Sequence, residues 1–154
     1  MDASIIRINV QRMQKLASRL QQAVERIDNV MPLNPLNFEP DQFDADAMMF
    51  LDAFRTRFSD LQDIIGKTMF HVVAVYDQEE SPAHRLSMRE RINLMEQKGL
   101  VGTSEWNELR EIRNSFAHEY PDEAEEKAEA LNAAWRLSSK LADLTKKIES
   151  YLCA

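Results

Sequence analysis

The side chains best suited to catalysis or anion binding lie in one stretch, "REIRNSFAHEYP", which covers residues 110–121. It places Arg113 on the apolar face of a predicted amphipathic helix and follows it with His118 and Tyr120. At about 100° per residue, Arg113 falls near the centre of an apolar arc of about 140°. A guanidinium keeps its proton at neutral pH, so a half-buried one needs a carboxylate partner or an anion supplied from a cleft.

The same side chains also allow a purely structural interpretation. Glu108, or an acid of the preceding long helix such as Asp60 or Asp63, can neutralise the arginine. A histidine near a helix end can act as a cap or a surface residue. A tyrosine before a proline can pack with its hydroxyl in solvent.

The hydrophobic pattern predicts helices on the N-terminal side of this stretch. Apolar residues recur in steps of three and four from Ile6 to Met31, which is the seam of a long amphipathic helix. Three prolines make residues 31–41 an irregular linker. Asp44 is predicted to cap a second long helix, whose buried stripe runs from Phe50 to Tyr76. Gly66 within that helix marks either a close approach of two helices or a tolerated glycine.

The remaining segments are also predicted to be helical. Ser87 is expected to cap a short helix that ends near Gly99. Thr103 or Ser104 is expected to cap the helix that carries the arginine, and Asp122 a long closing helix. Because no strand pattern competes, we predict an all-α fold, an up-and-down four-helix bundle with a short additional helix. A length of 154 residues suits one domain, residues 1–154.

Charge and composition restrict the classes of function. The net charge of -7 supplies no overall positive field for nucleic acid, so contact with RNA needs a local basic cluster, and DNA is not expected. No segment is apolar for long enough to span a membrane, and the single cysteine, Cys153, fits a reducing cytoplasm. Three scattered histidines and one cysteine make a metal site improbable, and no cofactor is expected.

The segment "RNSFAHEY", Arg113 to Tyr120, resembles the R-x4-H-x-Y signature of HEPN domains. The likeness is closest to the HepT-like toxins that are encoded beside minimal nucleotidyltransferase antitoxins. An all-α chain of this size, with the motif before a long last helix, is also similar to that family. The resemblance implies a HEPN-like bundle that forms a homodimer, with two motifs facing each other across a cleft. It also implies metal-independent endoribonuclease activity on RNA.

The resemblance assigns a role to each polar residue of the motif. Arg113 would bind the scissile phosphate and stabilise the charge that develops in the transition state. His118 would act as general base or acid on the 2′-hydroxyl or the leaving oxygen. Asn114 would orient the phosphate or the histidine. Tyr120 would be the residue that the nucleotidyltransferase antitoxin modifies with AMP, which would fill the RNA cleft with a bulky anion.

The surroundings of the motif are acidic, with Glu111 and Glu119 beside it. Binding of a polyanion therefore requires basic side chains from elsewhere in the fold. The candidates are five arginines: Arg55, Arg57, Arg89, Arg91 and Arg110.

Two other functions fit the same sequence. One is a non-catalytic HEPN module that binds nucleotide and docks onto a nucleotidyltransferase. The other is a helical interaction protein whose N-terminal seam forms a dimer or a heteromer, with the motif arising by coincidence. The seam alone does not decide, because such a stripe serves a bundle core as well as a partner helix.

Overall fold

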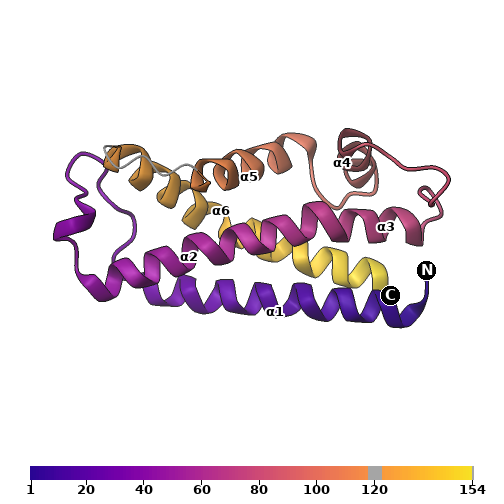
Figure 1. Cartoon of the computed structure of the whole chain (residues 1–154), viewed down its shortest axis with the longest axis horizontal. Coiled ribbons are helices and arrows are strands. Elements are labelled where there is room, and N and C mark those ends of the chain that lie inside the picture. Colours follow the sequence, from indigo (N-terminus) through magenta and orange to yellow (C-terminus); the bar gives the residue numbers. More distant parts are fainter. Residues whose placement is uncertain (118–122, 154) are drawn as a thin grey trace.

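The computed structural model describes residues 1–117 and 123–153, and the regular structure in these residues is helical (Figure 1). An isolated bridge between Ser81 and His84 is the one β-type pairing among them. The predicted all-α helical bundle is therefore confirmed. The elements in chain order are α1 (Ala3–Ile27), η1 (Pro40–Gln42), α2 (Ala45–Ile64), η2 (Ile65–Met69), α3 (Phe70–Tyr76), α4 (Met88–Gln97), α5 (Thr103–Phe116) and α6 (Ala124–Cys153).

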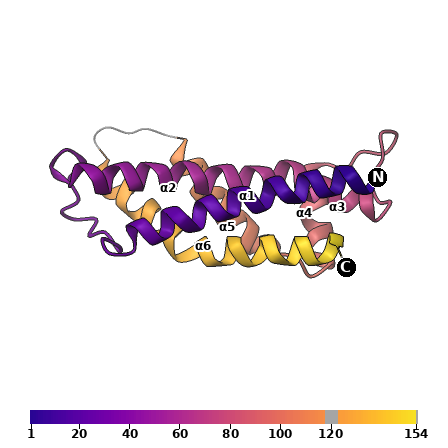
Figure 2. The same ribbon diagram turned by 90° about the horizontal axis from the view of Figure 1, so that it is seen from below.

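Helix α1 lies along the bundle and contacts α2 and α6 (Figures 1 and 2). Asp2 caps its N-terminus, because the carboxylate accepts a hydrogen bond of 3.0 Å from the Ser4 amide. The predicted seam is buried inside the chain's own core from Ile6 to Ile27. The helix therefore uses this stripe to stabilise the bundle rather than to present it to a partner.

The linker after α1 is held by one side chain of α6. The Asn132 side chain accepts a hydrogen bond from the Leu33 amide and donates one to the Leu33 carbonyl, both at 2.8 Å. Asn132 is itself buried, so these two bonds satisfy both ends of its amide. They fix the linker across one end of the bundle, with Leu33 and Phe38 turned into the core.

The second predicted helix is a continuous rod made of α2, η2 and α3. Asp44 caps it as predicted. Residues Ile65–Met69 form a π-helical turn, in which the backbone pairs over five residues instead of four. After this turn Phe70, Val72 and Val73 are buried, whereas Tyr76 is 41% exposed. The prediction that Tyr76 lies in the buried stripe is wrong: Tyr76 is the last residue of α3, where its ring meets that of Tyr151 edge to face with centroids 6.2 Å apart.

Helix α4 packs against α3 and α5 at one end of the bundle. Ser87 caps it through a complete capping box with Glu90. Gly99 follows with φ of 74°, a conformation that glycine adopts most easily. Both predicted ends of this helix are confirmed.

The predicted cap of α5 is wrong. Gly102 is the N-cap residue, and Thr103 is already in the helix. The Thr103 hydroxyl donates to the Glu96 carboxylate of α4, so it bridges two helices instead of capping one. The predicted cap of α6, Asp122, lies outside the described residues.

Helices α5 and α6 complete the bundle around a core rich in aromatic side chains. The largest fully buried aromatic residues are Phe54, Phe58, Phe70 and Trp106. Phe58 also meets Phe116 of α5 edge to face, with ring centroids 5.9 Å apart. Within residues 1–117 and 123–153, no helix combines the length and the hydrophobicity needed to cross a membrane.

Candidate functional site

The motif helix borders a pocket of about 320 Å³, which we call the α2–α5 pocket. One wall is the rod where α2 passes into the π-helical turn, and the opposite wall is α5. Met88, the first residue of α4, closes part of the rim. Arg113 and Asn114 both line this pocket, so the structure brings together two of the four predicted site residues.

Arg113 is paired with Asp63 of α2 in a bidentate arrangement. Its Nε donates to Asp63 Oδ1 and its Nη2 donates to Asp63 Oδ2, each at 2.9 Å. The two side chains are only 27% and 28% exposed, and the hydrogen bonds to Asp63 raise the pKa of Arg113. Of the three acids considered as partners from the sequence, Asp63 is confirmed. The pairing explains how an arginine lies in an apolar stripe.

The rim of the pocket carries more positive than negative charge. Lys67 Nζ lies 4.0 Å from Asp63 Oδ2, and Arg110 lies one turn before Arg113 on α5. Three cationic side chains and one carboxylate line the pocket, which is a formal charge of +2 in a chain of net charge -7. A local excess of this kind attracts an anion even where the overall field does not.

The inner wall of the pocket is formed where Gly66 meets Trp106. A Cβ atom at Gly66 would lie 2.7 Å from Trp106 Cζ2, so only glycine allows the indole to lie against the rod. Trp106 is also fixed by an edge-to-face contact with Phe70, with centroids 4.7 Å apart. The interpretation of Gly66 as a point of close helix approach is confirmed. The π-helical turn that contains it has no signal in the sequence.

The other predicted site residues are distributed as follows. His118 and Tyr120 lie outside the described residues. Of the five arginines considered as compensating charges, Arg110 lines the pocket. Arg57 instead donates to the Arg19 carbonyl at 3.1 Å, and Arg91 belongs to a different cluster.

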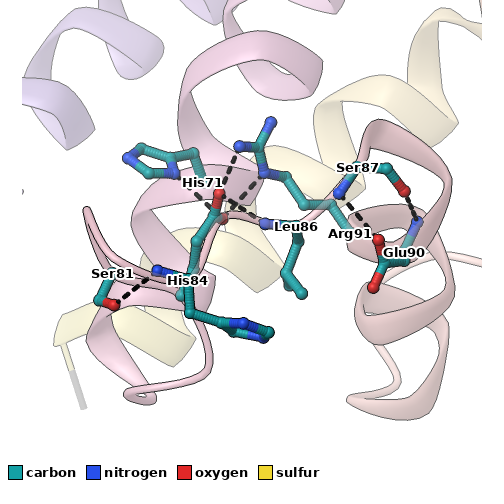
Figure 3. A network of polar contacts seen from close by, with 8 residues as sticks. His71, Ser81, His84, Leu86, Ser87, Glu90 and Arg91 are labelled. Atoms are coloured by element: carbon teal, nitrogen blue, oxygen red, sulfur yellow. Dashed lines mark hydrogen bonds and ion pairs between the residues drawn. The ribbon is translucent and has the colours of Figure 1, made fainter.

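That second cluster surrounds Glu80, whose carboxylate is fully buried and takes its partners from α3, α4 and the loop between them. Figure 3 shows three of the residues around it, His71, Leu86 and Arg91. Arg91 donates to it through Nε at 2.9 Å and through Nη2, and the Leu86 amide donates at 3.2 Å. His71 Nδ1 lies 3.1 Å from Glu80 Oε2. The hydrogen bonds from Arg91 lower the pKa of Glu80 to about 2, against the effect of burial.

The Glu80 cluster and the α2–α5 pocket use residues that are close in sequence. His71 follows Lys67 by four residues on the rod, and Arg91 follows Met88 by three on α4. Its bonds hold the loop between α3 and α4 and thereby position Met88 at the pocket rim. Among the described residues, no group of three or more His, Cys, Asp or Glu side chains is placed to hold a metal ion.

Comparisons with known proteins assign no function to the pocket. No protein-family model, no curated protein and no solved structure matches this chain. The interpretation of the pocket therefore depends on its own residues and on the R-x4-H-x-Y pattern in α5 and the residues after it.

Proposed function

We propose that this chain is a HEPN-type, metal-independent endoribonuclease, the toxin of a toxin–antitoxin pair, and that it binds a phosphodiester of RNA in the α2–α5 pocket. The observation that carries the proposal is the position of Arg113. The first residue of the motif lines a pocket with Lys67 and Arg110, so the start of the motif coincides with a local excess of positive charge. The resemblance in sequence and the electrostatics of the pocket point to the same ligand, a phosphate.

The proposed chemistry needs only side chains. Arg113 and Lys67 hold the non-bridging oxygens and stabilise the charge that grows on them in the transition state. His118 removes the proton of the 2′-hydroxyl, the 2′-oxygen attacks phosphorus, and the bond to the 5′-oxygen breaks. The products are a 2′,3′-cyclic phosphate and a 5′-hydroxyl, which takes up one proton. Asn114, beside the arginine, orients the phosphate.

Asp63 controls how the arginine meets this phosphate. Its carboxylate occupies Nε and Nη2 of Arg113, so an incoming phosphate first meets Lys67, Arg110 and the remaining Nη1 edge. To bind Arg113 bidentately, the phosphate has to displace Asp63. This pairing also favours the second candidate, a non-catalytic module that binds nucleotide and docks onto a nucleotidyltransferase. With Nε and Nη2 held by Asp63, Arg113 can contact an anion through Nη1 but does not grip a transition state with two hydrogen bonds.

Cleavage of RNA in EDTA tests the first candidate. Purified protein is incubated with total RNA and tRNA beside the His118→Ala and Arg113→Ala variants. Arg136→Ala, which changes an exposed arginine of α6, is the matched control. We expect EDTA-resistant cleavage that both site variants lose and the control keeps, with the helical circular dichroism unchanged. Cleavage that persists in His118→Ala contradicts the proposal.

The proposed partners are a second copy of the chain and a minimal nucleotidyltransferase antitoxin. Coexpression with that enzyme is expected to add mass in multiples of AMP. A Tyr120→Phe variant should not gain this mass. Nucleotide binding without cleavage, by a protein whose Tyr120 is unmodified, would favour the non-catalytic module.

A further inference from the structure

We infer that the inner part of the α2–α5 pocket is a subsite that recognises one base of single-stranded RNA, with Gln62 and Trp106 as the residues that contact the base edge. The inference rests on the proposed RNA substrate and adds to it a source of sequence preference. Phosphate contacts position a nucleic acid, whereas contacts to base edges specify its sequence.

Two polar side chains of the inner wall lack hydrogen-bond partners among the described residues, and one of them is a sealed, buried donor. Trp106 is 1% exposed, and its Nε1–H finds no hydrogen-bond acceptor in residues 1–117 and 123–153. Gln62, which is 3% exposed as a residue, is the second: among the hydrogen bonds of residues 1–117 and 123–153 its side-chain amide makes none, and its polar atoms stay open to the pocket rather than sealed. Buried donors and acceptors are almost always paired, because an unpaired one loses its hydration without compensation. Both residues line the pocket, so a ligand in the pocket is the partner that would satisfy them.

The rest of the inner wall suits a flat ring. Met88 supplies apolar surface, and the missing side chain of Gly66 lets the buried indole of Trp106 lie flush against the rod behind it. A volume of about 320 Å³ is at the lower end for ligand pockets, so it admits a single nucleotide rather than a larger cofactor. Unstacked RNA bases are recognised in this manner, by apolar contact with their faces and hydrogen bonds to their edges.

The rim and the inner wall together match the two parts of a nucleotide. Lys67, Arg110 and Arg113 at the rim fit the phosphate. The Gln62 amide offers one donor and one acceptor to neighbouring atoms of a base edge, as amides do when they read bases in DNA, and Trp106 Nε1 adds a second donor. Since the four bases present different donors and acceptors, this arrangement cannot bind them all equally.

Binding of the four nucleoside 3′-monophosphates to the full-length chain tests the inference, with inorganic phosphate as the reference. We expect the tightest nucleotide to bind at least tenfold more strongly than the weakest. Gln62→Met, which keeps the length of the side chain and removes its polar atoms, should reduce that ratio to below threefold and leave the affinity for inorganic phosphate unchanged. Arg110→Ala should weaken the binding of all four nucleotides and of inorganic phosphate by a similar factor.

The two tryptophans provide an internal control in NMR spectra of indole N–H groups. Trp135 Nε1 already donates to Asp28 at 2.9 Å, so its resonance should stay in place when nucleotide is added. The Trp106 resonance should move, and a Trp135→Phe variant assigns it. A Trp106 resonance that does not respond, or equal affinity for all four nucleotides, overturns the inference.

The outcomes also separate this inference from the proposed ribonuclease. Selective binding of one base without any cleavage of RNA supports the subsite and refutes the ribonuclease. Cleavage of RNA without any base preference, either at the cut site or in binding, refutes the subsite and leaves the ribonuclease in place.

Discussion

Glu80 is a buried charged residue whose replacement should lower the stability of the fold in a pH-dependent way. Its fully buried carboxylate accepts hydrogen bonds from Arg91 and from the Leu86 amide and lies beside His71. Glu80→Gln keeps the size of the side chain and removes its negative charge. Arg91, which is mostly buried, then loses its ion-pair partner between α3 and α4.

The size of the effect follows from the pKa of Glu80. That pKa is lowered from 4.5 to about 2, a difference of roughly 2.5 pH units at about 1.36 kcal/mol each. The charge of Glu80 therefore contributes roughly 3 kcal/mol to the free energy of unfolding at neutral pH. For a chain of 154 residues this corresponds to a loss of roughly 6–12 °C in Tm.

The pH dependence gives the effect a signature. Because the folded protein holds the Glu80 proton more weakly than the unfolded chain, the contribution is complete above pH 4.5 and is lost as the pH falls through about 2. Urea unfolding followed by circular dichroism at pH 7, 5, 4 and 3 measures it. The difference between wild type and Glu80→Gln should be constant from pH 7 to 5 and shrink below pH 4.

Glu108→Gln is the matched control, since Glu108 is an exposed glutamate of α5. It should change the free energy of unfolding by less than about 0.5 kcal/mol at every pH. A Glu80→Gln variant that loses less than about 1 kcal/mol at pH 7 would refute the reasoning. A difference in the free energy of unfolding between wild type and Glu80→Gln that does not change with pH would also refute it.

Four other predictions follow from individual contacts. Gly66→Ala should lower the free energy of unfolding in urea by about 1–2 kcal/mol, because overpacking against the indole outweighs the gain in helix propensity; a stabilised variant would contradict the close approach. Asn132→Leu should cost about 2–3 kcal/mol in the same assay, since it leaves two buried backbone groups of the linker unpaired. Asp63→Asn should tighten the binding of inorganic phosphate several-fold by calorimetry, because it frees the motif arginine; weaker binding would show that the carboxylate instead positions that arginine. In an ultraviolet titration Tyr151 should ionise above pH 10, because its hydroxyl donates to Asp77, and Tyr151→Phe should remove that late transition.

Some features of this protein are determined by residues that are close together in the sequence. The positions of Asp44, Ser87 and Gly99 predict helix ends, because a cap or a left-handed glycine acts on backbone groups within a few residues of itself. The apolar spacing of α1 predicts its buried face, since a regular helix repeats its geometry from turn to turn. The resemblance of residues 113–120 to the HEPN motif is likewise a property of the sequence alone.

Other features depend on contacts between distant residues. Asp60, Asp63 and Glu108 were all possible partners for Arg113, and the packing of α5 on α2 selects Asp63 across 50 positions of sequence. Thr103 satisfies its hydroxyl on α4, so a residue that can cap a helix does not do so here.

The pocket itself is also a product of tertiary structure. Gly66 lies in the π-helical turn and against Trp106 of α5, and the local sequence does not predict either the turn or this contact. Local sequence sets the backbone's preferred elements because its forces act within a turn or two of helix. The pocket's walls, charges and unpaired polar groups come from side chains on different helices, and only their packing decides which of them meet.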